Sequence, residues 1–167
     1  PDQSERHAHP LPKRQRNFVF RSGRRGKTEI SGYVRGHLCP AADRDSNKKL
    51  LKQTYLTSNV CPMTMNCNSG PWKVLEDSCR AIALSHGKVL VAAGPIFMNC
   101  NTNSSGRTKL IVPDGFYRIV KCLVHSDEYW FWYVANTFAL SKPVRLDRAQ
   151  LMNVLPAAVR NTGLLNY

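Results

Sequence analysis

The sequence predicts a mixed α+β fold, in which helices flank a mostly antiparallel central sheet. The first observation is a series of segments in the C-terminal half that are rich in β-branched and aromatic residues, the composition typical of strands. The second is the spacing of Trp72, Leu75, Cys79 and Ile82, which predicts a helix with one buried face. The third is the turn signal Pro-Asp-Gly at 113–115, which predicts a hairpin between two of the strands.

The N-terminal part contains short elements. Residues 1–16 are polar, basic and proline-bearing, and we expect a flexible arm there, followed by a single domain over residues 17–167. Asp45 or Ser46 is a candidate N-cap for a short helix that ends near residue 53. The expected elements before residue 61 are a strand at 17–20, a basic turn at 21–27, a strand at 29–37, that short helix, and an alternating strand at 54–60.

The best-marked element is a helix that ends at residue 86. Asn68 or Ser69 can cap it, Pro71 suits its first turn, and Gly87 ends it. Strands are then expected at 88–97, 108–113, 115–125 and 128–139. A last helix is expected at 146–155, and Pro156 limits it.

The chain is strongly basic. Its 167 residues carry 24 Lys and Arg against 11 Asp and Glu, a formal net charge of +13. Such a charge concentrates anions, and nucleic acid would be held through its phosphates. The alternatives are solubility or adhesion to an acidic surface. No apolar run approaches the roughly eighteen residues that a membrane span requires, so we expect no membrane partner.

The six cysteines are the next feature. They form no C-x-x-C pair, and no histidine lies at zinc-finger spacing from them, which disfavours a structural zinc. We expect at least one disulfide and therefore a secreted or periplasmic location. The alternative is buried thiols in an organellar or cytoplasmic protein.

His37 is a candidate general base. It follows Gly36, where backbone can approach a ligand closely, and it ends an expected strand. A neutral imidazole can take a proton from water near neutral pH. The alternative is an ordinary surface or core histidine.

The long helix offers a candidate site for a hard cation. Asn68 and Glu76 lie within about 80° of one helix face, and Arg80 follows Glu76 by one turn. An amide oxygen and a carboxylate with several waters suit Mg²⁺, and an arginine suits a phosphate. The alternative is a capping asparagine with a surface salt bridge between Glu76 and Arg80.

Three linked stretches carry a family resemblance. They read "SGYVRGHLCPAAD" from residue 31, "YLTSNVCP" from residue 55 and "NSGPWKVLEDSCR" from residue 68. Together they resemble the DNA/RNA non-specific endonucleases, a family that includes the Serratia nuclease and endonuclease G and has a ββα-metal active-site motif. The match is dense over residues 31–97 and continues loosely to "NTGLL" near the C-terminus.

The resemblance implies a role for each matching residue. His37 would be the general base, Asn68 the direct protein ligand of a water-rich Mg²⁺ or Mn²⁺, and Glu76 the residue that holds metal-bound water. Arg35 and Arg80 would contact phosphate and steady the transition state. Candidates outside these roles are Asn59, which would support His37, and Arg16 or Arg14, which would add a phosphate contact upstream.

The resemblance also implies the reaction. It would be Mg²⁺-dependent hydrolysis of phosphodiester bonds in DNA and RNA, leaving 5′-phosphate and 3′-hydroxyl ends. A base, a cation and arginines meet the requirements of phosphodiester cleavage. A site that touches phosphate and not base edges cannot read sequence.

Two positions depart from the family pattern. Val34 stands where the family usually has Asp, and Met63 stands where it usually has Gln. We expect the chemistry to survive the first change, and we expect Val34→Asp to leave activity the same or modestly higher. A second hypothesis is a catalytically impaired relative that only binds nucleic acid, and Val34 is the residue that supports it. A third is a toxin or effector nuclease with a dedicated inhibitor.

Overall fold

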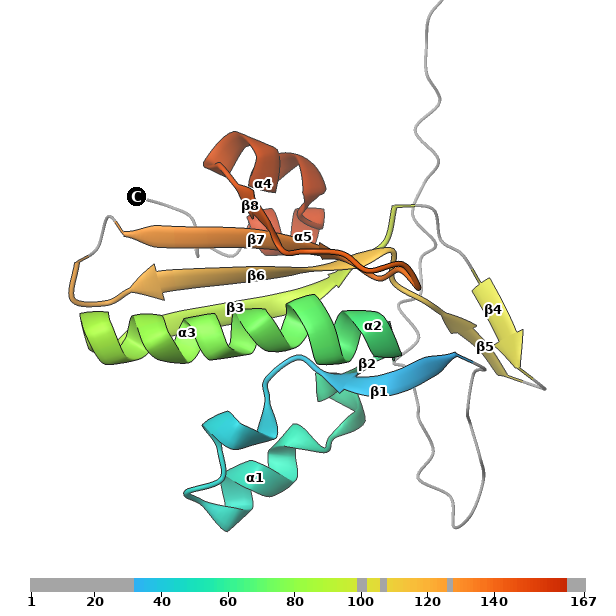
Figure 1. The fold of residues 1–167 in the computed structure, drawn as a ribbon, viewed down its shortest axis with the longest axis horizontal. Coiled ribbons are helices and arrows are strands. Elements are labelled where there is room, and N and C mark those ends of the chain that lie inside the picture. Colours follow the sequence, from blue (N-terminus) through green and yellow to red (C-terminus); the bar gives the residue numbers. More distant parts are fainter. Residues whose placement is uncertain (1–31, 99–101, 106–107, 126–127, 162–167) are drawn as a thin grey trace, which may run out of the picture.

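The computed structural model describes residues 32–98, 102–105, 108–125 and 128–161. In this part of the chain a four-stranded sheet has the order β3-β6-β7-β8, and two-stranded sheets are formed by β1 with β2 and by β4 with β5. Every pairing is antiparallel, and helices lie against the main sheet (Figure 1). The predicted α+β fold with a mostly antiparallel sheet is therefore confirmed.

The strands and helices have these bounds. The strands are β1 (Tyr33–His37), β2 (Val60–Thr64), β3 (Val89–Ile96), β4 (Thr102–Ser105), β5 (Thr108–Ile111), β6 (Gly115–Cys122), β7 (Tyr129–Ala135) and β8 (Val144–Leu146). The helices are η1 (Ala41–Asp43), α1 (Lys48–Thr54), η2 (Thr57–Asn59), α2 (Met65–Cys67), η3 (Asn68–Trp72), α3 (Lys73–His86), α4 (Arg148–Val154) and α5 (Ala157–Arg160).

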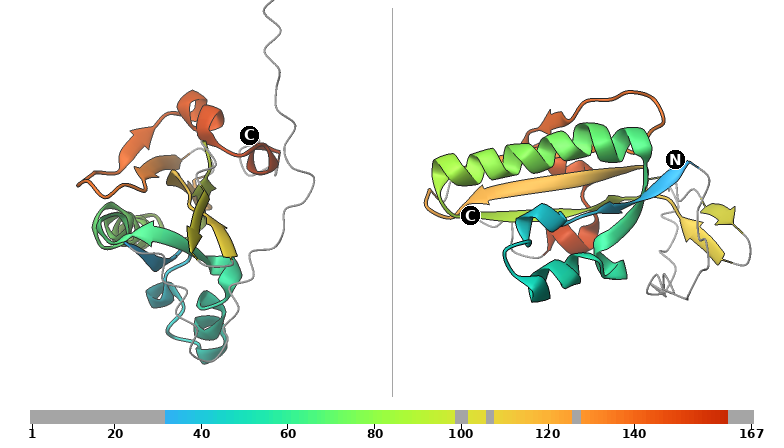
Figure 2. Two further views of the ribbon diagram at one scale, coloured as in Figure 1. Left: turned by 90° about the vertical axis from the view of Figure 1, so that its right-hand side faces the viewer. Right: turned by 60° about the horizontal axis from the view of Figure 1, so that its bottom comes forward.

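Strand β6 is the centre of the domain and is buried along its whole length. Phe116 and Val120 pack in one core cluster with the buried side chains of α3, whereas Tyr117 and Ile119 pack in a second cluster with those of α4. Helices α3 and α4 consequently cover opposite faces of the sheet (Figure 2). Because side chains alternate along a strand, Arg118 shares the face of Phe116 and lies under α3.

The long helical run begins earlier than the sequence suggests. Thr64 caps it by accepting a hydrogen bond from the Cys67 backbone N–H, and α2, η3 and α3 then follow one another without a gap. Asn68 has helical dihedrals inside this run, so the prediction of Asn68 or Ser69 as the N-cap is wrong. The predicted end is confirmed, since Gly87 follows α3 with a φ of +79°.

The segment at 54–60 is not the alternating strand that the sequence predicts. It contains the 3-10 turn η2, and β2 begins only at Val60. The Asn59 side chain donates to the Thr54 carbonyl oxygen at 2.9 Å and so closes this turn. The short helix before it is confirmed, but Asn47 caps it in place of Asp45 or Ser46.

The turn at 113–115 is not a hairpin between its neighbouring strands. Strand β5 pairs with β4, and β6 pairs with β3. The Asp114 N–H donates instead to the carbonyl oxygen of Ile96 at 2.9 Å, which leads the chain into the centre of the sheet. The sequence also missed β4, β8 and α5, which are all short.

Several expectations lie outside the described residues. These are the arm at 1–16, the strand at 17–20 and the basic turn at 21–27. The strand expected at 29–37 is confirmed from Tyr33 onward, and the last helix is confirmed as α4 with a capping box at Asp147. The single-domain boundary at residue 17 stays a prediction. No helix among the described residues is both long enough and apolar enough to span a bilayer.

Candidate active site

The two faces of β1 have different roles. Val34 packs against the core cluster beside α3, and Gly36 is buried. Arg35 is exposed and His37 is half-buried, so both belong to the other face of the strand. Because of this alternation, the Arg35 guanidinium and the His37 imidazole both point away from the core, on the same face of β1.

Gly36 is required for packing, not for ligand access as the sequence suggested. A Cβ atom built on it would lie 2.1 Å from the Met63 sulfur and 2.4 Å from the Met63 Cγ. Met63 is fully buried and therefore fills the space beside the glycine. The bare backbone of Gly36 lets β1 lie against this side chain, which fixes the strand that carries His37.

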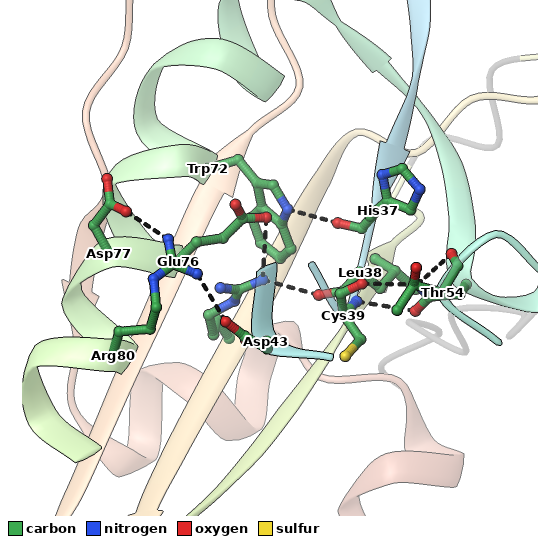
Figure 3. Close-up of polar contacts among 11 residues, drawn as sticks. His37, Leu38, Cys39, Asp43, Thr54, Trp72, Glu76, Asp77 and Arg80 are labelled. Atoms are coloured by element: carbon green, nitrogen blue, oxygen red, sulfur yellow. Dashed lines mark hydrogen bonds and ion pairs between the residues drawn. The ribbon is translucent and has the colours of Figure 1, made fainter. Parts of the chain in front are cut away.

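His37 is held by its backbone and leaves its ring nitrogens available. Its carbonyl oxygen accepts a hydrogen bond of 2.8 Å from Trp72 Nε1, as Figure 3 shows. Its ring packs edge-to-face against Tyr55, with 5.4 Å between the ring centroids. No described residue hydrogen-bonds to either ring nitrogen, so the imidazole can accept a proton from a water molecule.

Asn59 orders the backbone that follows His37. Its side chain accepts from the Cys39 N–H and donates to the Cys39 carbonyl oxygen, both at 2.9 Å. Its own backbone carbonyl accepts from the Leu38 N–H at 2.9 Å. The structure thus places Asn59 as a support for the chain beyond His37, without a described contact to the imidazole ring.

Asn68 lies at the junction of α2 and η3 and is half-buried. Two residues later, Gly70 departs from helical dihedrals, with φ of −102° and ψ of −110°. The side-chain amide group of Asn68 has no hydrogen-bond partner among the described residues. Its side-chain oxygen is therefore free to bind a cation or a water molecule.

Glu76 projects from α3 and is largely buried, with 17% of its side chain exposed. Burial raises the pKa of this carboxyl group, and the positive charges of Arg118 and Arg80 oppose the rise. The Arg118 Nη2 atom lies 4.0 Å from Glu76 Oε1. Glu76 is therefore a partly desolvated carboxylate that neighbouring cations help to keep charged.

Arg80 does not form the salt bridge with Glu76 that the alternative interpretation of the sequence contained. Its guanidinium instead donates to Asp43 at 2.8 Å and to Asp77 at 2.5 Å (Figure 3). These two hydrogen bonds raise the pKa of Arg80 above its usual value. Asp43 belongs to the segment after His37, so this ion pair also ties that segment to α3.

The donor set suits a hard cation. In the described part of the chain, no three His, Cys, Asp or Glu side chains come close enough together to hold a metal. The oxygen atoms on offer are the Asn68 amide and the Glu76 carboxylate, which lie on the same helical run. One or two protein oxygens completed by water are a pattern that Mg²⁺ accepts and zinc does not favour.

Comparison with a protein-family model identifies the family of this chain. The model described as DNA/RNA non-specific endonuclease matches residues 6–156. This chain belongs to the DNA/RNA non-specific endonuclease family. Its β1, β2 and α2–η3–α3 supply the ββα motif that the sequence resemblance implied.

Named relatives agree with this family. A nuclease of Nostoc sp. is 34% identical over 117 residues, which are 70% of this chain and 42% of the relative. Human mitochondrial endonuclease G is 30% identical over 100 residues, which are 54% of this chain and 33% of the relative. The chain thus spans less than half the length of these two relatives. A crystal structure of the EndoG/EndoGI complex has a TM-score of 0.59 at 19% identity and covers 75% of this chain and 58% of its own, which supports the fold.

The two departures from the family pattern face each other. Val34 of β1 is the direct cross-strand partner of Met63 of β2. Both are apolar and both belong to the core beside α3. In this chain the pair is therefore a packing contact, and Val34 does not face the side of β1 that carries His37.

Arg118 is a residue beside the candidate site that sequence reasoning missed. It is 1% exposed, in the middle of β6, and lies within reach of Glu76 and of the backbone beyond His37. The available signal was a lone arginine inside the apolar run "GFYRIVKC". Arg14 and Arg16, the other residues that the sequence suggested for the candidate site, lie outside the described residues.

The cysteines correct the expectation of a disulfide. Cys39, Cys61, Cys67, Cys79 and Cys122 are all unpaired thiols, and Cys100 lies outside the described residues. Burial raises the pKa of Cys61 and of Cys67 to about 11, so both remain protonated at neutral pH. The cysteines therefore no longer support export, and the relatives include both mitochondrial and bacterial nucleases.

Proposed function

We propose that this chain is a Mg²⁺-dependent, sugar-non-specific endonuclease that cleaves DNA and RNA and leaves 5′-phosphate and 3′-hydroxyl ends. The observation that carries the proposal is the hydrogen bond from Trp72 Nε1 to the His37 carbonyl oxygen. It joins the strand that ends in His37 to the helical run that carries Asn68 and Glu76. This bond supports the proposal because it ties the candidate base and the candidate oxygen donors for a cation to one framework.

His37 acts as the general base in this proposal. A ring nitrogen without a described partner takes the proton of the attacking water, while the fixed backbone sets the direction of the ring. Arg35, on the same face of β1, contacts a phosphate oxygen. Arg80 does so as well, after exchanging a carboxylate for the phosphate.

Asn68 would hold the cation directly, and Glu76 would orient water in its shell. The cation would supply positive charge that offsets the negative charge developing on the phosphate oxygens. Partial burial strengthens the electrostatic interactions of Glu76, because a less polar surrounding screens charge less.

The low specificity follows from what the proposed residues can contact. Arginines, a histidine and a cation bind or act on phosphate groups, which are the same in every nucleotide. The substrates would therefore be DNA and RNA without sequence preference. Val34 packs in the core, so it gives little support to the alternative of a relative that only binds nucleic acid.

The metal requirement can be tested with plasmid nicking. We expect Mg²⁺-dependent nicking that EDTA abolishes, and Asn68→Ala should raise the Mg²⁺ concentration for half-maximal rate by at least about tenfold. Asn153→Ala, an exposed helical asparagine on α4, is the matched control and should behave as the wild type. A protein that binds DNA but never nicks it with Mg²⁺ or Mn²⁺ would contradict the proposal and favour a silent binder.

Binding to nucleic acid should depend steeply on salt. With a formal net charge of +13, and if about six phosphates are contacted, affinity should fall about 10³-fold between 50 and 200 mM salt. Fluorescence anisotropy in EDTA with several duplexes of one length and different sequence measures this. Binding that is independent of salt, or that selects one sequence strongly, would refute phosphate-only recognition.

A further inference from the structure

We propose that Arg118 is a positioning residue that locks the strand carrying His37 to the helix carrying Glu76. The inference rests on the proposed nuclease function, because it gives Arg118 a task within that site. Arg118 comes from β6, outside the three stretches that carry the family resemblance.

Arg118 contacts both halves of the site. Its Nη2 donates to the Leu38 carbonyl oxygen at 2.9 Å and lies 4.0 Å from Glu76 Oε1. Its guanidinium carbon lies 4.1 Å from the centroid of the Trp72 ring. The side chain is 1% exposed, so these groups and the surrounding core fix its position.

Three successive carbonyl groups are held in this way. The carbonyl of His37 accepts from Trp72, that of Leu38 accepts from Arg118, and that of Cys39 accepts from Asn59. Trp72 and Arg118 also lie against each other, so the first two donors form one unit. The backbone at and after His37 is therefore held continuously, and Arg118 supplies the link that reaches the sheet.

The charge of Arg118 is equally important. A buried guanidinium needs a negative partner, and Glu76 is the carboxylate within salt-bridge distance of it. A buried carboxylate likewise needs a cation to remain ionised. The Arg118 guanidinium thus favours the ionised form of Glu76, and the carboxylate offsets the buried charge of Arg118.

A second nitrogen of Arg118 supports a role beyond packing. Its Nε is buried and has no hydrogen-bond partner among the described residues. Buried polar groups are normally paired, and exceptions concentrate where structure serves function. A residue that only filled the core would achieve the same packing with an apolar side chain.

The test compares two variants. Arg118→Met keeps most of the side-chain length and loses the charge, whereas Arg118→Lys keeps the charge and loses the planar guanidinium group with its several N–H donors. Arg145→Met is the matched control, because Arg145 also lies over a tryptophan, at 5.2 Å from the Trp132 ring, and donates to a backbone carbonyl. Arg145 belongs to β8 and is exposed.

The first readout needs no catalysis. Carbon-detected NMR of labelled glutamate in metal-free protein follows the Glu76 titration, which Arg118 from β6, Arg80 and Lys73 from α3, and Asp43 from η1 all influence. We expect the Glu76 pKa to rise in Arg118→Met, because a cation that favours the charged form is lost, and to stay near the wild-type value in Arg118→Lys. The Trp72 indole N–H resonance should move in both variants, and Arg145→Met should change neither signal.

The second readout is the kinetics of cleavage. We expect kcat to fall about 10²-fold in Arg118→Met and about tenfold in Arg118→Lys, with KM changed less than about threefold. The acid limb of the rate profile should move to higher pH in Arg118→Met. Because Arg118→Lys keeps the charge and most of the volume, it tests the backbone link even if Arg118→Met does not fold.

The outcomes separate the two proposals. If folded Arg118 variants leave the Glu76 titration, the Trp72 resonance and kcat unchanged, the positioning role is refuted. If Arg118 variants lower only the melting temperature, the residue is structural and the inference is also refuted. If the NMR signals change as expected but the wild type does not cleave nucleic acid, the proposed nuclease function fails while the link between Arg118 and Glu76 stands.

Discussion

Replacing His37 with alanine is expected to lower the rate of phosphodiester cleavage by a factor of about 10² to 10⁴ while leaving DNA binding nearly intact. The proposed base would be lost, but Arg35 and the basic surface would still hold phosphate. The fold should tolerate the change, because the hydrogen bond from Trp72 uses the backbone carbonyl of residue 37 and not its ring. Single-turnover cleavage and anisotropy in EDTA separate the two effects.

His86→Ala serves as the control for this experiment. His86 lies at the last position of α3, where its ring contacts Ser85 at 2.7 Å and Glu128 at 3.4 Å. Because its ring nitrogens already have partners and it is far along the helix from Glu76, the variant should cleave at nearly the wild-type rate. A His37→Ala variant that cleaves as fast as the wild type would mean that the base lies elsewhere, at His86 or His125.

Val34→Asp is expected to destabilise the protein by about 2–4 kcal/mol, which reverses the expectation from sequence. The family resemblance suggested a harmless return to a common residue. In the structure Val34 packs against the core cluster and faces the fully buried Met63 on the neighbouring strand β2. A carboxylate there would lose apolar contact and gain no described partner. Urea unfolding measures the difference, and activity should fall with it because β1 carries His37.

Two further variants make this prediction specific. Val144→Asp places the same change at an exposed strand position, where 51% of the residue is accessible, and should cost less than about 1 kcal/mol. Val34→Asp combined with Met63→Gln should recover part of the loss, since an amide can hydrogen-bond the carboxylate. If Val34→Asp is as stable as the wild type, the packing role of Val34 is wrong.

Sequence reasoning succeeded where one short pattern determines the local structure. The stripe from Trp72 to Ile82 predicted the buried face of α3, and the aromatic run at residue 129 predicted β7, because helical and strand periodicities are local. It failed where contacts between residues distant in the sequence determine the local structure. The segment before Asn59 alternates like a strand, yet the Asn59 side chain bonds to Thr54 and Cys39 and makes a turn instead.

The same distinction applies to the residues of the candidate site. His37, Asn68 and Glu76 could be proposed as site residues because they occupy short motifs in one order along the chain. Arg118 could not, because its meaning depends on α3 covering one face of β6, and this is a property of the assembled sheet. The partners of Arg80 were misjudged for a related reason. Asp77 and Asp43 both accept hydrogen bonds from the Arg80 guanidinium, and Asp43 is 37 positions away in the chain.

The carboxylates around Arg80 have a consequence for how substrate enters. In the free protein, Asp43 and Asp77 each pair with one terminal nitrogen of Arg80. In the proposed nuclease these carboxylates would stand where phosphate oxygens bind, as internal mimics of the substrate. An arriving backbone phosphate would exchange with them and would not fill an empty positive site. Because the arginine only exchanges one anion for another, a single small anion would gain little binding free energy at this position. A polyanion, which brings many phosphates at once, can complete the exchange, and this would favour chains of nucleotides over free phosphate.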